Sequence, residues 1–512
     1  MAAGPTTIQD QGATGILPED HARRNAALVW LLVALIVVGG GLLRWRDLVD
    51  RPLWIDEAAF WLSSRASLID KLAWRHHYEH PPLAYMVEGW TFQLLGDRPE
   101  WIVRMPSFLF GLSCIPLAFL LGRAIGGDLM GVLAAAVAAA DPVMVEQARQ
   151  ARMYSQFQTL MLLTLLTAIR LARRRPAKHL PWLGLGLLEA SLYWTSQAAL
   201  AAWLGQILGM FWIRRARPEE SDSGRSHWGW TWTVAFVLSI PGLYRLVYRL
   251  LHPILNKDDV TGAAELATHM ATTVVGVFGR FGILFLPLAV VGLWFLLRER
   301  QVAGRLLAAI AGLNLAGLLV LRLIHPLLKP RYLVALLPAV WMGAAAFVVF
   351  GPFGPRVRRV AFVVALAGMV ANDLRPGRGK EFLVSEEIRA LPQVAAPGDA
   401  IVYLPRFNYK IGSYYGLPPS PSLAEDVTAP TAAELDGRRV WLVSGTLPAD
   451  RHVREARGLM EDLAQRRGTD ASFVEGAVAR DYTGVVRFDL AGPPSAWRLE
   501  AGRWVQEPSA AP

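Results

Sequence analysis

The sequence predicts a mainly α-helical, polytopic membrane protein with a small α/β domain at its C-terminal end. Hydrophobic residues make up 53% of the 512 residues, and many of them are gathered in runs of bilayer-spanning length. A single globular core could not bury so many apolar runs. From about residue 376 the runs become short and strand-like and are separated by Gly and Pro.

Charge and cysteine content limit the function classes. The formal net charge is +10, but the basic residues lie beside apolar runs, as in membrane proteins, and no nucleic-acid-binding motif is present. We therefore expect contacts with membrane lipids and none with nucleic acid. The single cysteine, Cys114, lies in an apolar segment, which excludes intrachain disulfides and a Cys-based zinc site.

The N-terminal part predicts a tail, one span and a long loop. Residues 1–25 are polar and predict a disordered cytoplasmic tail, and the apolar run 26–43 predicts an uncleaved first span. Residues 44–103 mix charged and aromatic residues, which indicates an external loop with amphipathic helices at the membrane interface. Its apolar segment 83–95 has only 13 residues, fewer than a span requires.

Further apolar runs bring the prediction to about eleven spans in a membrane domain of residues 26–375. They lie at 104–123, 128–141, 156–171, 180–195, 197–213, 229–250, 274–297, 303–324, 331–350 and 357–373. With the N-terminus in the cytoplasm, even-numbered spans end on the cytoplasmic side. Several of them end in basic clusters, as the positive-inside rule requires: Arg173 to Arg175, Arg214 and Arg215, Arg298 and Arg300, and Arg356, Arg358 and Arg359.

An odd number of spans places the C-terminal domain, residues 376–500, outside the cytoplasm. The runs 400–404, 439–443 and 485–490 predict strands, and 451–466 has the apolar spacing of an amphipathic helix. Strands interleaved with helices favour a partly parallel sheet. Residues 501–512 predict a disordered tail.

Polar residues on the external face indicate a site. Asp56 and Glu57 follow the first span, where carboxylates are costly and usually functional, although acids can also simply begin a surface helix. Several cations fall on the same predicted face, against the charge rule: Arg104, Arg152, Lys329 and Arg331. Such a set beside an acidic pair indicates an anionic ligand such as a phosphate, while snorkelling explains any single one equally well.

The stretch Glu79-His80-Pro81-Pro82 allows two interpretations. The two prolines fix a rigid turn that redirects the chain. Alternatively, His76 and His80, four residues apart, would share a helical face and could bind a divalent metal. Because the prolines begin directly after His80, we favour the structural interpretation and assign no metal ligand.

Four motifs in order resemble a known class of enzyme. The first motif combines Asp56–Glu57 with His80–Leu83, and the other three are Arg104–Gly111, Gln147–Ser155 and Lys329–Pro338. Together they resemble the polyprenyl-phosphate-sugar-dependent glycosyltransferases of the GT-C class, in the bacterial branch similar to protein O-mannosyltransferases and lipid A aminoarabinose transferases. The resemblance covers about residues 26–350 and implies the GT-C fold for the membrane domain.

The resemblance also implies an activity, the transfer of a monosaccharide from a polyprenyl-phosphate donor to a hydroxyl of a protein, lipid or glycan. It implies Asp56 as the base and Glu57 as the second acid of the pair. Donor phosphate would be bound by the cations Arg104, Lys329 and Arg331. Glu79 and His80 match positions that carry an acid and a Lys in the aminoarabinose transferases. Because the Lys is a His here, the resemblance gives weaker support for phosphate binding by His80.

The second external loop departs from the same relatives. They carry a further Asp there, whereas this chain has Met153 and Tyr154, so that role is not transferred. Arg152 and Tyr154 are expected to line the site.

The chemistry of such a transfer agrees with these residues. It needs a base for the acceptor and stabilisation of the leaving phosphate, and in-line displacement would invert the anomeric centre. The alternatives are a transporter or flippase, which would place charges mid-span and show internal repeats, and a polymerase or ligase of surface polysaccharide. We expect a multi-pass protein of the bacterial inner membrane with its C-terminal domain outside the cytoplasm.

Overall fold

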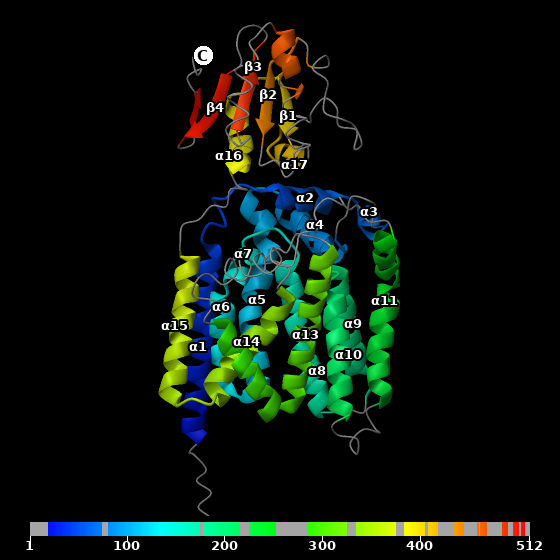
Figure 1. The fold of residues 1–512 in the computed structure, drawn as a ribbon, viewed down its shortest axis with the longest axis vertical. Coiled ribbons are helices and arrows are strands. Elements are labelled where there is room, and N and C mark those ends of the chain that lie inside the picture. Colours follow the sequence, from blue (N-terminus) through cyan, green and yellow to red (C-terminus); the bar gives the residue numbers. More distant parts are fainter. Residues whose placement is uncertain are drawn as a thin grey trace, which may run out of the picture.

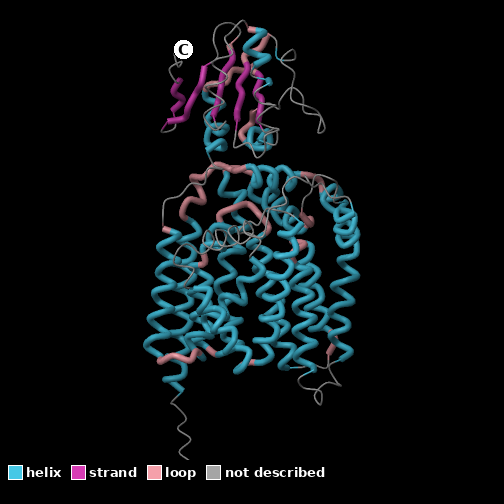
Figure 2. Tube along the Cα trace, in the orientation of Figure 1, coloured by secondary structure: helices cyan, strands magenta, loops and turns pink. Residues whose placement is uncertain are grey.

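The computed structural model describes most of residues 19–506. The segments it leaves undescribed within this range are 74–79, 175–177, 216–224, 252–284, 325–333, 375–382, 405–407, 418–434, 436, 445–457, 460, 468–483, 490–494 and 501–502. Figure 1 shows two parts, a bundle of long helices and a smaller sheet domain at one end of it. Figure 2 shows that the strands are confined to the smaller part.

Long helices run side by side along the bundle (Figure 1). They are α1 (Glu19–Trp45), α5 (Glu100–Gly126), α6 (Asp128–Ala140), α8 (Tyr154–Arg174), α9 (Leu180–Thr195), α10 (Ala199–Arg215), α11 (Arg225–Leu251), α13 (Gln301–Ile324), α14 (Leu337–Phe350) and α15 (Pro355–Asp373). Residues 285–299 are also helical. Every predicted apolar run that lies wholly within the described residues falls on one of these helices.

Two of the described helices are long and apolar enough to cross a membrane, Asn25–Trp45 of α1 and all of α5. Helix α6 and the short α7 (Pro142–Ala148) would together make a third span, bent by 59°. Two shorter helices, Ala199–Ile213 and Val334–Phe350, are also apolar. The mainly helical fold is therefore confirmed, while the number of about eleven spans stays a prediction.

Helix α5 lies at the centre of the bundle and packs closely on α6. Glycines allow this approach, because a Cβ added at Gly122 would lie 2.8 Å from the Met130 carbonyl oxygen. A Cβ at Gly131 would lie 2.7 Å from the Phe119 carbonyl oxygen. Small residues at such contacts let helix backbones meet in membrane proteins, so the α5–α6 pair is a rigid unit on which the site is built.

Three short helices form the predicted external loop. They are α2 (Ile55–Arg65), α3 (Leu68–Ala73) and α4 (Leu83–Leu95), and they lie across the end of the bundle below the sheet domain (Figure 1). Leu68, Ile69 and Leu72 of α3 are exposed. Exposed apolar side chains on a short helix beside the bundle fit the predicted interfacial location.

The sheet domain contains five strands in the order β1-β2-β3-β4-β5. The strands are β1 (Ala400–Leu404), β2 (Val440–Ser444), β3 (Gly484–Phe488), β4 (Ser495–Glu500) and β5 (Arg503–Gln506). Strands β1 and β2 are parallel and the other pairs are antiparallel, so the sheet is mixed. Residues 461–466 are helical, as predicted.

Helices cover the side of the sheet domain that faces the bundle. They are α16 (Leu383–Ala390), the 3₁₀ turn η4 (Leu391–Gln393) and α17 (Tyr409–Tyr414). Ile401 and Trp441 pack on this side with Ile388, whereas Val402 and Leu442 pack on the other. The sheet therefore has a buried layer on each face, as the period of two along its strands requires.

At both chain ends the described residues, 19–25 and 503–506, differ from the prediction. Residues 501–512 were expected to be disordered, but β5 pairs with β4, with Glu500 opposite Arg503. This edge strand is mostly exposed, so it lacks the apolar alternation by which strands are recognised. Residues 19–25 were assigned to the disordered tail, but they belong to α1, because a helix can extend beyond its apolar run.

Glu387 on α16 makes the stability of the sheet domain depend on pH. Burial, and then the neighbouring Glu386, raise the pKa of the Glu387 carboxyl from 4.5 to about 7. A raised carboxyl pKa means that the folded state binds the proton more tightly than the unfolded chain does. Its stabilising effect is complete below the unfolded pKa and is lost as the pH rises through about 7.

We therefore expect Glu387→Gln to raise Tm relative to wild type at pH 8 and to leave it nearly unchanged at pH 4. Thermal unfolding at both pH values measures this. Glu461→Gln, at an exposed position in the same domain, is the control and should give no gain that depends on pH. An equal gain for Glu387→Gln at both pH values would contradict the assignment.

Candidate active site

The end of the bundle is organised by a buried ion pair between α2 and α5. Arg104 Nε donates to Glu57 Oε1 and Arg104 Nη2 donates to Glu57 Oε2, both at 2.8 Å. The two side chains are 1% and 0% exposed. Paired charges at this depth hold α2 in one orientation on α5, because breaking the pair would leave a charge buried alone.

The remaining hydrogen bonds of Arg104 go to the loop before α2. Its Nη1 donates to the carbonyl oxygens of Leu48 (2.9 Å) and Arg51 (2.8 Å), and Nη2 donates to that of Pro52 (2.9 Å). A guanidinium has five N–H groups, and all of them are used within the protein. In this arrangement Arg104 has no N–H group left for a donor phosphate, and its bonds hold the loop before α2 on α5.

Glu57 is equally occupied. Besides the two bonds from Arg104, it accepts hydrogen bonds from the backbone N–H groups of Ala151 (2.8 Å) and Trp54 (3.3 Å). The carboxylate is fully buried and joins α2 to the segment after α7. In this arrangement the Glu57 carboxylate has no exposed oxygen to offer a substrate.

Asp56, unlike Glu57, has a partly exposed side chain. Its side chain is 26% exposed, and Arg152 Nη1 lies 3.6 Å from Asp56 Oδ2. The same nitrogen donates to the Asp56 carbonyl oxygen at 3.1 Å. Asp56 is thus an accessible carboxylate held beside a cation.

Arg152 connects Asp56 to His80. Arg152 Nη2 and His80 Nε2 lie 3.2 Å apart, and the guanidinium carbon lies 5.9 Å from the Tyr154 ring centroid. Three predicted site residues, Asp56, His80 and Arg152, are therefore brought together from α2, the turn before α4 and the segment before α8. Tyr154 begins α8 directly beside them.

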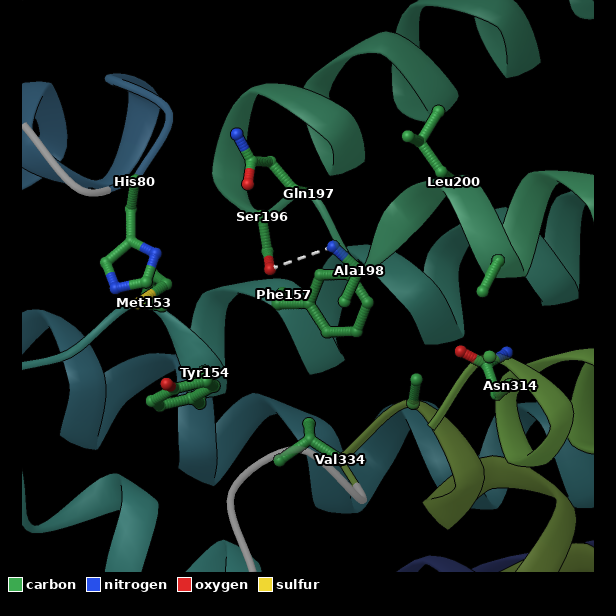
Figure 3. A pocket seen from close by; sticks show the side chains of 13 residues that line it. His80, Met153, Tyr154, Phe157, Ser196, Gln197, Ala198, Leu200, Asn314 and Val334 are labelled. Carbon is green, nitrogen blue, oxygen red and sulfur yellow. Dashed lines mark hydrogen bonds between the residues drawn. The ribbon is translucent and has the colours of Figure 1, made fainter. Parts of the chain in front are cut away.

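A cavity of about 390 Å³ opens next to this group. Figure 3 shows His80, Met153 and Tyr154 on one side, Asn314 on the other, and Ser196 and Gln197 between them. Most of the wall is apolar, from Met153, Phe157, Leu200, Val334 and several alanines. A concave, mainly apolar pocket with a few polar groups is typical of a small-molecule site.

Three predicted site residues, Glu79, Lys329 and Arg331, lie outside the described residues. Gln197 and Asn314, which are not among the predicted site residues, also line the cavity. Asn314 is a polar residue inside an apolar run, and that contrast was the available signal. Within the described part of the chain, no group of three His, Cys, Asp or Glu side chains could hold a metal.

Comparison with protein families gives one match. Residues 79–210 match the family described as dolichyl-phosphate-mannose-protein mannosyltransferase. The matched part includes His80, Arg104, Arg152, Tyr154 and Gln197. A search of curated protein sequences gives no match.

Solved structures share the architecture. ArnT from Cupriavidus metallidurans bound to undecaprenyl phosphate has 16% identity and a TM-score of 0.56, covering 85% of this chain and 95% of that one. The apo structure of the same ArnT has 14% identity and a TM-score of 0.57, and the match covers 82% of this chain and 93% of that one. A third match is the archaeal oligosaccharyltransferase AglB from Archaeoglobus fulgidus, in complex with an inhibitory peptide and a dolichol-phosphate. It has 11% identity and a TM-score of 0.51, and the match covers 95% of this chain and 75% of that one.

These matches confirm the resemblance predicted from the four motifs. The structural matches show the fold, and the family match covers the segment that contains His80, Arg152 and much of the cavity wall. The chain is therefore similar to ArnT in fold over most of its length, and to the protein mannosyltransferases over residues 79–210, which indicates a glycosyltransferase of the GT-C type.

Proposed function

We propose that this enzyme transfers a monosaccharide from a polyprenyl-phosphate donor to an acceptor hydroxyl, with Asp56 as the base. The observation that carries the proposal is the position of Asp56. It is the accessible member of the acidic pair, and it lies beside Arg152, which in turn contacts His80 at the edge of the cavity. A base must be able to reach the acceptor hydroxyl.

In this reaction Asp56 removes the proton of the acceptor hydroxyl, and the oxygen attacks the anomeric carbon. The bond between that carbon and the phosphate oxygen breaks, and the polyprenyl phosphate leaves with the bonding electrons. Attack opposite the leaving group inverts the anomeric centre. Only the accessible carboxylate of the pair serves, because Glu57 is fully buried and bonded to Arg104.

The leaving phosphate needs positive charge. Because Arg104 is committed to the protein, we assign this role to Arg152, which reaches both Asp56 and His80. Lys329 and Arg331 remain proposed phosphate ligands on the strength of the family resemblance alone. Cations in a site that contains little water stabilise a developing anion strongly.

We assign the cavity to the donor. Its apolar wall suits the isoprenoid chain next to the phosphate, and Gln197 and Asn314 offer polar groups to a sugar. The matched ArnT and AglB structures contain undecaprenyl phosphate and a dolichol-phosphate, which supports a donor of this class here. The acceptor would be a hydroxyl of a protein, lipid or glycan.

The proposed location is a bacterial inner membrane, with residues 26–375 as the catalytic membrane domain and residues 376–500 as an extracytoplasmic domain. Positive residues at the ends of the predicted even-numbered spans support this orientation. The sheet domain lies at the same end of the bundle as α2 (Figure 1), so the proposed site and this domain would lie on one side of the membrane.

Asp56→Asn is the direct test of the base. The change removes the negative charge but keeps the shape, so we expect transfer to fall by about 10²-fold or more while Tm is unchanged. Transfer is measured from radiolabelled polyprenyl-phosphate sugars to membrane acceptors. Asp97→Asn, which alters a partly exposed ion pair with Arg65, is the control, and full activity of Asp56→Asn would refute the assignment.

Gly317→Phe tests the cavity. Gly317 lines it, and a Cβ there would lie 3.9 Å from Ala201 Cβ, so the larger ring would enter the space without a backbone clash. We expect undecaprenyl phosphate to stop raising the Tm of this variant. Gly312→Phe, on the same helix where an added Cβ meets nothing within 4 Å, should retain the effect; loss in both variants would remove the cavity from the proposal.

Arg104→Lys separates the structural role from phosphate binding. Lysine cannot replace the five donors of the guanidinium, so we expect a loss of about 3–5 kcal/mol in the free energy of unfolding. Arg65→Lys, at an exposed pair, should cost about 0–1 kcal/mol. Chemical unfolding measures both, and a stable Arg104→Lys variant with a raised donor KM would restore the phosphate role.

A further inference from the structure

The sheet domain reaches the loop that carries Asp56 through one tyrosine. Tyr415, directly after α17, donates its hydroxyl hydrogen to Glu100 Oε1 at 3.1 Å. The same oxygen accepts a hydrogen bond from the Leu53 backbone N–H at 3.0 Å. Leu53 lies three residues before Asp56, so the hydroxyl bridges α5 and the backbone that leads to the base.

This hydroxyl meets a need of the backbone. Leu53 precedes the first turn of α2, so its N–H has no partner within the helix, and the residue is fully buried. A buried N–H without an acceptor is costly. Burial, and then Glu100, raise the pKa of the Tyr415 hydroxyl, so it keeps its proton and bridges the two groups throughout the physiological range.

Tyr414, the residue before Tyr415, contacts helix α2 through its aromatic ring. Tyr414 packs edge-on against Trp61 of α2, with ring centroids 5.1 Å apart, and Arg98 lies 4.5 Å from the Tyr414 ring centroid. Among the described residues, the buried Tyr414 hydroxyl has no hydrogen-bond partner. Tyr414 and Tyr415 thus provide two adjacent phenols, one of which bonds to the site loop and one of which does not.

Two further contacts extend this junction. Arg389 of α16 donates from Nη1 to the Asp50 carbonyl oxygen at 3.1 Å, and its Nε lies 3.6 Å from Glu100 Oε1. Ala58 of α2 is fully buried in the cluster that contains Ile388 and Ile411 of the sheet domain. The loop and the start of α2 are therefore held by Arg104 on the bundle side and by the sheet domain on the other.

We propose that the sheet domain positions the base, with Tyr415 as the positioning residue that fixes the backbone at Leu53 and thereby the place of Asp56. This inference rests on the proposed function only in taking Asp56 as the base. Tyr415 itself contacts neither the cavity nor Arg152 among the described contacts. Its loss should therefore slow the transfer step and leave the binding of the donor unchanged.

The test compares Tyr415→Phe with Tyr414→Phe in the full-length protein. Both changes delete one phenolic oxygen, but only the first deletes a link to the loop. We expect Tyr415→Phe to speed amide hydrogen exchange in the segment 50–58 by about tenfold, the effect of one lost buried hydrogen bond. We expect kcat to fall by a similar factor while the KM for the donor stays within about twofold, and Tyr414→Phe to resemble wild type.

A double variant adds a readout that a general loss of stability would not give. In the Asp56→Asn background, Tyr415→Phe should lower the residual rate no further, because the base that it positions is absent. Equal exchange and equal kcat in the two phenylalanine variants would overturn the proposal, as would a raised donor KM with unchanged kcat.

The exchange measurement also separates this proposal from the proposed function. If wild type transfers no sugar from any donor, the proposed function fails. Faster exchange in Tyr415→Phe would then still support the link between the sheet domain and the loop, and unchanged exchange would overturn it.

Discussion

The buried pair of Glu57 and Arg104 is the constraint on which the site depends. Removing two charges from water is costly, and the cost is recovered only where every donor and acceptor is satisfied. Here the guanidinium uses all its donors, and the carboxylate accepts four hydrogen bonds. These bonds converge on one point from α2, α5, the loop before α2 and the backbone of Ala151, so the place of Asp56 is set by the same network.

Two adjacent carboxylates receive opposite roles through the geometry of a helix. Successive residues point about 100° apart around a helix axis, so when Glu57 points into the bundle, Asp56 points aside. One carboxylate is fully buried and paired, whereas the other is 26% exposed and close to Arg152. In the proposed function, Asp56 acts as the base because Glu57 is the residue that faces inward, and the dipeptide alone does not determine which of the two does so.

The parts of this structure that sequence could predict are those fixed by local pattern. Apolar runs located the helices, and short apolar runs bounded by Gly and Pro located β1, β2 and β3, because run length is a property of the chain itself. Strand β4 and the exposed edge strand β5 have no such run and were not predicted. The roles of Glu57 and Arg104 depend on contacts between residues 47 positions apart, and a motif shared with a family does not reveal whether a charged residue meets a ligand or another residue.

The proposed lipid-linked donor would explain why the polar network lies at the end of the bundle. The phosphate of such a donor stays near the headgroups while its tail remains among lipids, so the proposed base, Asp56, would have to be held at a fixed depth. A short helix such as α2, which lies across the end of the bundle, keeps one position only if it is held by contacts on both sides. Arg104 fastens α2 to a membrane helix, and Tyr415 and Arg389 fasten the preceding loop to the sheet domain. Groups held in place before the substrate arrives need no reorganisation during the reaction. The contacts of α2 and its preceding loop with both the helix bundle and the sheet domain keep them in place.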